Sequence, residues 1–154
     1  MKRRDASKGG KKKFVLVLPS KLSQLSKVEG FLAKANVVMH LDEVQFNKLY
    51  LAASEAVTNG ILHGNKQDPG KKVTLVCEVG GRSVVLRVRD EGNGHDFSHL
   101  VNPLDKDNLI KENGRGIFLM RTLMDAVRFQ KHNGGLEVVM KLIRHNPPRI
   151  DIRM

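Results

Sequence analysis

The sequence has a single cysteine and no long apolar run. Cys77 therefore has no partner for an internal disulfide, and its place in the apolar segment Val73–Val79 predicts a buried strand residue. No segment approaches the roughly 18 consecutive apolar residues of a transmembrane helix. The first residues lack the apolar stretch of a secretory signal. We therefore expect a cytoplasmic protein without a membrane span.

Aromatic residues are also scarce, with six Phe, one Tyr and no Trp. This disfavours the RNA-binding sheets that stack bases on aromatic side chains. The net charge of +11 is concentrated in residues 2–13, where seven basic residues against Asp5 give +6 and leave +5 for the rest. A Gly/Lys-rich segment cannot bury enough apolar surface to fold, so residues 1–13 are predicted to form a disordered basic tail. Direct nucleic-acid binding is disfavoured.

The remaining chain has the composition and length of one folded domain. Hydrophobic residues make up 40% of the 154 residues, which suffices for a core. We expect the domain over 14–143 and an extension over 144–154. Apolar periodicity and turn residues predict strands and helices in this order: strand Phe14–Leu18, a helix capped by Ser20, a helix from the capping pair Asp42 and Gln45 to Gly64, strands Lys72–Val79 and Ser83–Asp90, a loop over 91–113, helix Gly114–Met124, and a hairpin of Ala126–Lys131 with Leu136–Ile143.

The grouping of strands in hairpins predicts an α+β fold. Its expected form is a two-layer sandwich, in which helices cover one face of a mixed, mostly antiparallel sheet.

Glu55 and Asn59 lie four residues apart on the second predicted helix, and His63 continues the row. Such neighbours lie about 5–6 Å apart on one helix face. The row is offset from the apolar stripe, so it borders a cleft or solvent. A carboxylate there can accept a proton, and an amide oxygen is a suitable ligand for Mg²⁺. The pair alone is equally typical of a solvated helix, and His63 is expected to be structural.

Two glycine-rich segments follow. The first, Asp90-Glu-Gly92-Asn-Gly94, leaves an apolar strand with an acidic residue and glycines that allow close backbone approach. The second, Gly114-Arg115-Gly116, opens the predicted helix Gly114–Met124, whose N-terminal N–H groups and dipole favour an anion. Neither is a Walker loop or a dinucleotide-binding fingerprint. Each taken singly is also compatible with an ordinary turn.

The three segments taken in order resemble the N, first-glycine and second-glycine boxes of the GHKL ATPases. The chain is similar to the small anti-sigma-factor serine kinases of that superfamily, from about Phe14 to Ile143. The resemblance implies the Bergerat fold with ATP and Mg²⁺ as cofactors. It also implies partners, namely a sigma factor and an anti-anti-sigma protein that is phosphorylated on serine, and a homodimer.

The resemblance also implies roles for individual residues. Glu55 would be the base that polarises the attacking hydroxyl, and Asn59 would ligate Mg²⁺. Asp90 would bind the adenine amine, with Gly92 and Gly94 shaping the pocket. The second-glycine box would form the hinge of a lid and hold phosphate; its residues are Gly114, Arg115 and Gly116.

Two positions depart from the family pattern: His95 replaces a bulky apolar residue, and Leu136 replaces a threonine near adenine. They keep open an alternative, in which ATP orders the lid and sets partner affinity with little kinase activity. A histidine kinase fragment is disfavoured because no dimerisation helix with a phospho-accepting histidine precedes the domain.

Overall fold

The computed structural model describes residues 10–93 and 112–145. Its strands are β1 (Lys12–Pro19), β2 (Lys72–Val79), β3 (Ser83–Arg89), β4 (Ala126–His132) and β5 (Gly135–Ile143). Its helical elements are the 3₁₀ turn η1 (Leu22–Leu25), α1 (Ser26–Met39), α2 (Glu43–Asn59), the π-helix η2 (Gly60–Gly64) and α5 (Glu112–Leu123). None of the helices in the described part of the chain is long and apolar enough to cross a membrane.

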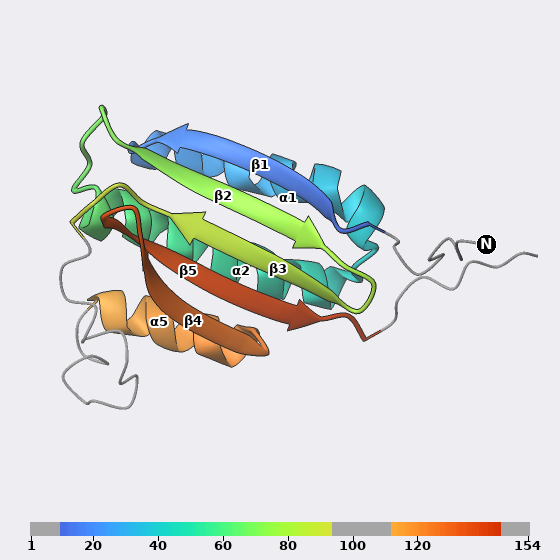
Figure 1. The fold of residues 1–154 in the computed structure, drawn as a ribbon. Helices are drawn as coiled ribbons and strands as arrows, with labels where there is room; N and C mark the ends of the chain where they lie inside the picture. The colour runs from blue at the N-terminus through green and yellow to red at the C-terminus, as the bar shows by residue number, and fades with distance from the viewer. Residues whose placement is uncertain (1–9, 94–111, 146–154) are drawn as a thin grey trace, which may run out of the picture.

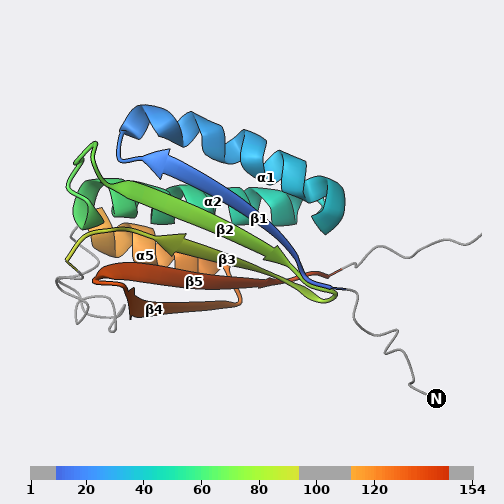
Figure 2. The same ribbon diagram turned by 45° about the horizontal axis from the view of Figure 1, so that its top comes forward.

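The strands form one sheet in the order β1-β2-β3-β5-β4. Every pairing between these strands is antiparallel, so the mixed character that we expected is not seen in the described residues. All three α-helices lie on the same side of the sheet (Figure 1), and the turned view in Figure 2 shows the same two layers. The predicted α+β sandwich with helices on one face is confirmed.

Apolar side chains that alternate along the strands meet the apolar stripes of the helices in one core. Leu49, Ala53, Val57 and Ile61 form the predicted stripe of the second helix, and all are fully buried. Cys77 is also fully buried, and this burial raises the pKa of its thiol to about 12. The thiol is therefore protonated and unreactive at neutral pH, in line with a structural strand residue.

The first strand begins earlier than the sequence indicated. Lys12 pairs with Val79 and Lys13 with Glu78, so the last two residues of the predicted tail belong to the sheet. Residues 1–9 lie outside the described part. At the other end, Arg144 donates to the Met39 carbonyl oxygen at 2.8 Å and also contacts the Gly80 carbonyl. This guanidinium fixes the start of the predicted extension to the end of α1.

The predicted cap at Ser20 is wrong. The Ser20 hydroxyl is buried and donates to the Lys71 carbonyl oxygen at 2.8 Å, and the following helix begins with the 3₁₀ turn η1. The cap at Asp42 is confirmed, since its carboxylate accepts from the Gln45 N–H at 2.7 Å. The Gln45 amide does not return the bond but donates to the Ile143 carbonyl, tying α2 to β5.

On the open face of the sheet, the Glu137 carboxylate lies between Arg87 and Arg89, with its side chain only 2% exposed. Gln130 also donates to it, and Arg87 makes a second ion pair with Glu78 at 2.9 Å. Burial alone would raise the pKa of Glu137, but the hydrogen bonds from Arg89 and Gln130 and the charges of Arg89 and Arg87 lower it. The carboxylate is thus ionised in the folded state.

We expect Glu137→Gln to reduce the free energy of unfolding by about 2 kcal/mol at pH 7, because it leaves two arginines without their buried partner. Because the pKa of Glu137 is lowered on folding, its contribution is present above the ordinary carboxyl pKa of about 4.3 and is lost as the pH falls below it. When the wild type and Glu137→Gln are unfolded with urea at several pH values, their free energies of unfolding should therefore approach each other from pH 7 to pH 3. Glu78→Gln, which removes one half-exposed pair, is the control and should cost about 0.5 kcal/mol.

Candidate functional site

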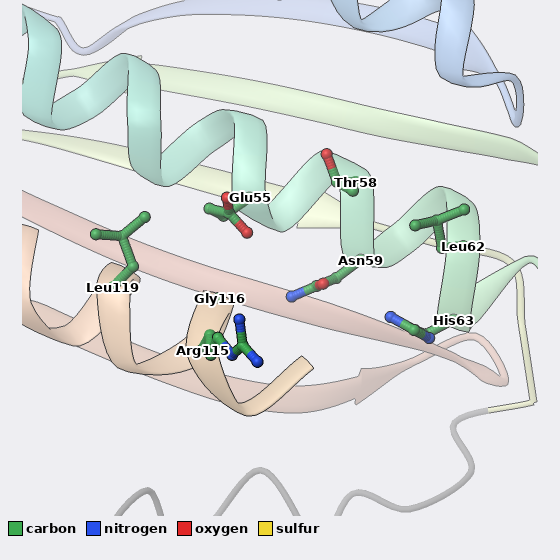
Figure 3. Close-up of a pocket in the computed structure, with 8 residues that line it drawn as sticks. All are labelled: Glu55, Thr58, Asn59, Leu62, His63, Arg115, Gly116 and Leu119. Carbon is green, nitrogen blue, oxygen red and sulfur yellow. The ribbon is translucent and has the colours of Figure 1, made fainter. Parts of the chain in front are cut away.

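A cavity of about 280 Å³ lies between the second half of α2 and the first turns of α5. Glu55 and Asn59 occupy adjacent turns of α2, and Figure 3 shows both side chains on the side of the helix that faces α5. His63 continues the row into η2 and also lines the cavity. The cavity is lined by Glu55, Thr58, Asn59, Leu62, His63, Arg115, Gly116 and Leu119.

The helix that carries this row changes its winding where the cavity ends. From Gly60 to Gly64 it is a π-helix, and the Asn65 N–H donates to the Gly60 carbonyl oxygen at 2.8 Å. Short π-segments inside helices are frequent at functional sites. The wider turn helps to place His63 on the cavity side and Gly64 beneath the end of β3.

The second glycine-rich segment is helical. We predicted that the helix starts on Gly114, but α5 begins at Glu112, so both glycines lie in its first turns and not in a loop before it. A Cβ atom at Gly116 would lie 2.8 Å from Glu55 Oε2 and 3.3 Å from Asn59 Nδ2. A side chain at position 116 would therefore require the Glu55 carboxylate to shift.

We expect Gly116→Ala to lower any activity that depends on Glu55 by about tenfold, because the added methyl group must displace the Glu55 carboxylate. The matched control is Gly30→Ala in α1, where the added Cβ meets nothing within 4 Å. Alanine is the better helix former by up to about 1 kcal/mol, so this control should be fully active and slightly more stable. A steady-state activity assay and thermal unfolding, made on both variants, separate an effect on the site from an effect on stability. Equal activity of Gly116→Ala and Gly30→Ala would contradict the close approach of Gly116 to Glu55.

The cavity has an electropositive side. The N-terminal turn of α5 supplies backbone N–H groups and the positive end of the helix dipole, and the exposed Arg115 guanidinium lies at the same place. An arginine can hold two oxygens of a phosphate or carboxylate together. The carboxylate and amide of α2 thus share one cavity with the positively charged Arg115 near the start of α5.

Asp90 follows β3 and is 8% exposed. Its Oδ1 accepts from the N–H groups of Gly92 at 3.0 Å and Leu136 at 3.1 Å. Burial raises the pKa of Asp90, and these two bonds and the charge of Lys71 oppose that rise. The two described donors share Oδ1, and no described donor is bonded to Oδ2.

Glycines surround this carboxyl group at van der Waals distance. A Cβ at Gly64 would lie 2.2 Å from Asp90 Oδ2, and one at Gly135 would lie 2.1 Å from the Asp90 carbonyl oxygen. A Cβ at Gly92 would lie 2.0 Å from the Gly64 carbonyl oxygen. Asp90 therefore occupies a socket that side chains would fill.

The structure brings the predicted residues together in two groups. Glu55, Asn59, Arg115 and Gly116 share the cavity with His63, and Gly114 lies in the first turn of α5 beside it. Asp90 and Gly92 form the second group, which η2 connects to the first because His63 lines the cavity and the next residue, Gly64, contacts Asp90. Gly94 and His95 lie outside the described residues.

Sequence reasoning missed the contributions of the β4–β5 hairpin and of Asn65. Leu136, noted above for its side chain, binds Asp90 through both of its backbone groups. Asn65 is buried and bonds to three segments. An asparagine just past a His-Gly helix end was a signal for a structured helix terminus, but nothing local pointed to its partners.

Comparisons with known proteins are consistent with this geometry. Residues 18–142 match the model of the histidine kinase-like ATPase domain. The chain is 34% identical over 116 residues to the serine-protein kinase RsbW of Bacillus subtilis, covering 71% of this chain and 70% of that protein. It is 34% identical over 131 residues to an anti-sigma F factor of Anoxybacillus flavithermus, covering 80% and 88%. The crystal structure of RsbU and RsbW domains from Mycobacterium tuberculosis shares the fold, with a TM-score of 0.63 over 90% of this chain and 33% of that one, at 18% identity.

Proposed function

This chain belongs to the histidine kinase-like ATPase family and, within it, to the group of serine-protein kinases and anti-sigma factors, and we propose that it binds a sigma factor and phosphorylates a serine of an anti-anti-sigma protein with ATP. The observation that carries the proposal is the close approach of Gly116 to Glu55 and Asn59. In this contact, Gly116 of the second-glycine box lies against Glu55 and Asn59 of the N box. Names that describe relatives as serine-protein kinases favour this activity over the nucleotide-dependent switch without transfer.

We assign the cavity between α2 and α5 to the phosphates and the Asp90 socket to adenine. Arg115 and the first turn of α5 neutralise the phosphate charge, and Asp90 Oδ2 accepts from the adenine amine. Glu55 takes the proton of the serine hydroxyl while the serine oxygen forms a bond to the γ-phosphorus of ATP. The bond from that phosphorus to the bridging oxygen breaks at the same time, and ADP leaves.

The residues present fit a magnesium ion held together with a nucleotide. The described residues contain no cluster of three or more His, Cys, Asp or Glu side chains that could hold a metal by themselves. Mg²⁺ in nucleotide sites needs few protein ligands, because phosphates and water supply the others. Asn59 lines the cavity, and its Oδ1 is the ligand that we propose. When bound, the ion offsets the negative charge of the phosphates.

The proposed partners rest on the relatives that are named serine-protein kinases and anti-sigma factors. We propose that the sigma factor and the anti-anti-sigma protein both bind this chain, and that it works as a homodimer. Cytoplasmic action is part of the proposal, since a sigma factor acts there.

The test uses the full chain and γ-labelled ATP. Partners are recovered on the immobilised protein from its native lysate with and without ATP, and the recovered proteins are then assayed for phosphoserine. We expect label on one captured protein and release of ADP. Tight ATP binding and partner capture without any transferred label would contradict the kinase and favour the switch.

A further inference from the structure

Asn65 joins four segments of the chain at the end of the helix that carries the site. Its Nδ2 donates to the Ser20 hydroxyl at 2.7 Å and to the Lys72 carbonyl at 2.9 Å. Its Oδ1 accepts from the Glu91 N–H at 2.7 Å. The residue is 1% exposed, so these bonds form out of water. The ends of β1, η2 and β3 and the start of β2 therefore meet at one amide.

One of these bonds acts on the residue next to Asp90. The Glu91 N–H, which belongs to the peptide group between Asp90 and Glu91, donates to Asn65 Oδ1. The Lys72 N–H in turn donates to the Glu91 carboxylate at 2.8 Å. On the side of β5, Asp90 N–H donates to the Leu136 carbonyl at 3.0 Å. Asp90 is thus tied on both sides, to η2 through Asn65 and to the β4–β5 hairpin through Leu136.

The backbone just after Asn65 shows that this junction is held by its bonds and not by local preference. Lys66 and Gln67 have φ angles of 50° and 57°, the left-handed region that residues with a Cβ atom disfavour. The Gln67 N–H donates to the Ile61 carbonyl at 2.7 Å, which returns the chain to η2. Strained backbone of this kind persists where the surrounding structure fixes it.

We propose that Asn65 is a positioning residue for nucleotide recognition, which fixes Asp90 against the adenine amine through the Glu91 N–H. The inference rests on the proposed ATP site. It deepens that site by assigning base selectivity to a residue that does not contact the nucleotide. Without the amide, the end of β3 separates from η2, and the carboxylate no longer stays in its glycine socket.

The test compares Kd values for ATP and GTP, because guanine has a carbonyl where adenine has the amine. For Asn65→Ala we expect the Kd for ATP to rise about tenfold and the Kd for GTP to change less than about threefold. The KM for ATP should rise in parallel, while kcat at saturating ATP stays within about threefold, because Glu55 and Asn59 lie on preceding turns of the helix. Asn65→Ser is the second variant, since a hydroxyl is too short to make all three bonds.

Two control variants separate positioning from stability. Asn36→Ala removes an equivalent amide that accepts from Leu41 N–H at 2.9 Å at the end of α1, away from the cavity. Ser20→Ala removes one partner of Asn65 but leaves the bond to Glu91. Both should lower the melting temperature and keep the ratio of the two Kd values. Asn65 variants that melt earlier with the wild-type ratio would overturn the proposal. A wild-type protein that does not bind ATP would instead refute the ATP site itself, and one that binds ATP and GTP equally would refute the assignment of Asp90 to the adenine amine.

Discussion

Replacement of Glu55 by glutamine should reduce kcat for phosphoryl transfer by about 10²–10⁴-fold, the usual contribution of a general base. The amide keeps the size of the carboxylate but cannot take the proton of the attacking hydroxyl. Glu55 lies against Gly116 in the cavity that we assign to the phosphates, and Asp90 lies outside that cavity. The Kd for ATP should therefore change by less than about threefold, as for an interaction made in the transition state only.

The control for this variant is Glu43→Gln in the first turn of the same helix. It loses a favourable charge at the helix N-terminus, worth about 0.3–1 kcal/mol, and should retain full transfer activity. Single-turnover transfer from γ-labelled ATP measures the chemical step, and equilibrium binding measures affinity. Transfer by Glu55→Gln at the wild-type rate would show that the proton has another acceptor.

The general architecture was predictable because its signals are local. Alternating apolar residues and the Gly80-Gly81 and Asn133-Gly134 turns determine the two hairpins, and the observed strands agree with the predicted ones within a few residues. Asn133 and Gly134 have φ angles of 48° and 85°, as a tight hairpin turn requires. The face of α2 that carries Glu55 followed from its period alone.

The features that the sequence predicted wrongly or did not reveal depend on contacts between segments far apart in the chain. Ser20 resembled a helix cap, but its hydroxyl bonds to Lys71 and Asn65, both far along the chain. The helix predicted to start on Gly114 begins two residues earlier, at Glu112, and the close packing of Gly116 on Glu55 and Asn59 of α2 could not be read from the local sequence. The roles of Gly64 and Gly135 were equally hidden. Each is small because the Asp90 carboxyl group or its peptide occupies the space of a side chain.

The Asp90 socket combines binding with a cost in stability. Because burial raises the pKa of Asp90 above the ordinary value of about 3.9, folding favours its protonated form. The sign follows from linkage: the contribution of this group to stability is full below the unfolded pKa and is lost as the pH rises through the folded pKa. The ionised form of Asp90 is therefore the form that folding disfavours, and we propose that nucleotide binding is what requires it.

Asp90→Asn separates these two effects. The N–H groups of Gly92 and Leu136 both donate to Oδ1, so the asparagine oxygen stays there and its NH₂ group takes the place of Oδ2. A donor then faces the adenine amine, and the Kd for ATP should rise by about 10²–10³-fold, as when a buried polar partner is mismatched. The melting temperature at pH 7 should equal or exceed that of the wild type, because the charge is gone.

Asp68→Asn is the matched control, since Asp68 occupies an exposed turn where its carboxylate accepts from the nearby Gly70 N–H at 2.9 Å. It should change neither the Kd for ATP nor the melting temperature appreciably. Calorimetric titration with ATP and thermal unfolding at pH 7 and pH 5 measure both quantities. The advantage of Asp90→Asn in stability should shrink toward pH 5, as more of the wild-type carboxyl group is protonated. Wild-type affinity in this variant would mean that adenine is read elsewhere, and a lower melting temperature would mean that the carboxylate serves the fold.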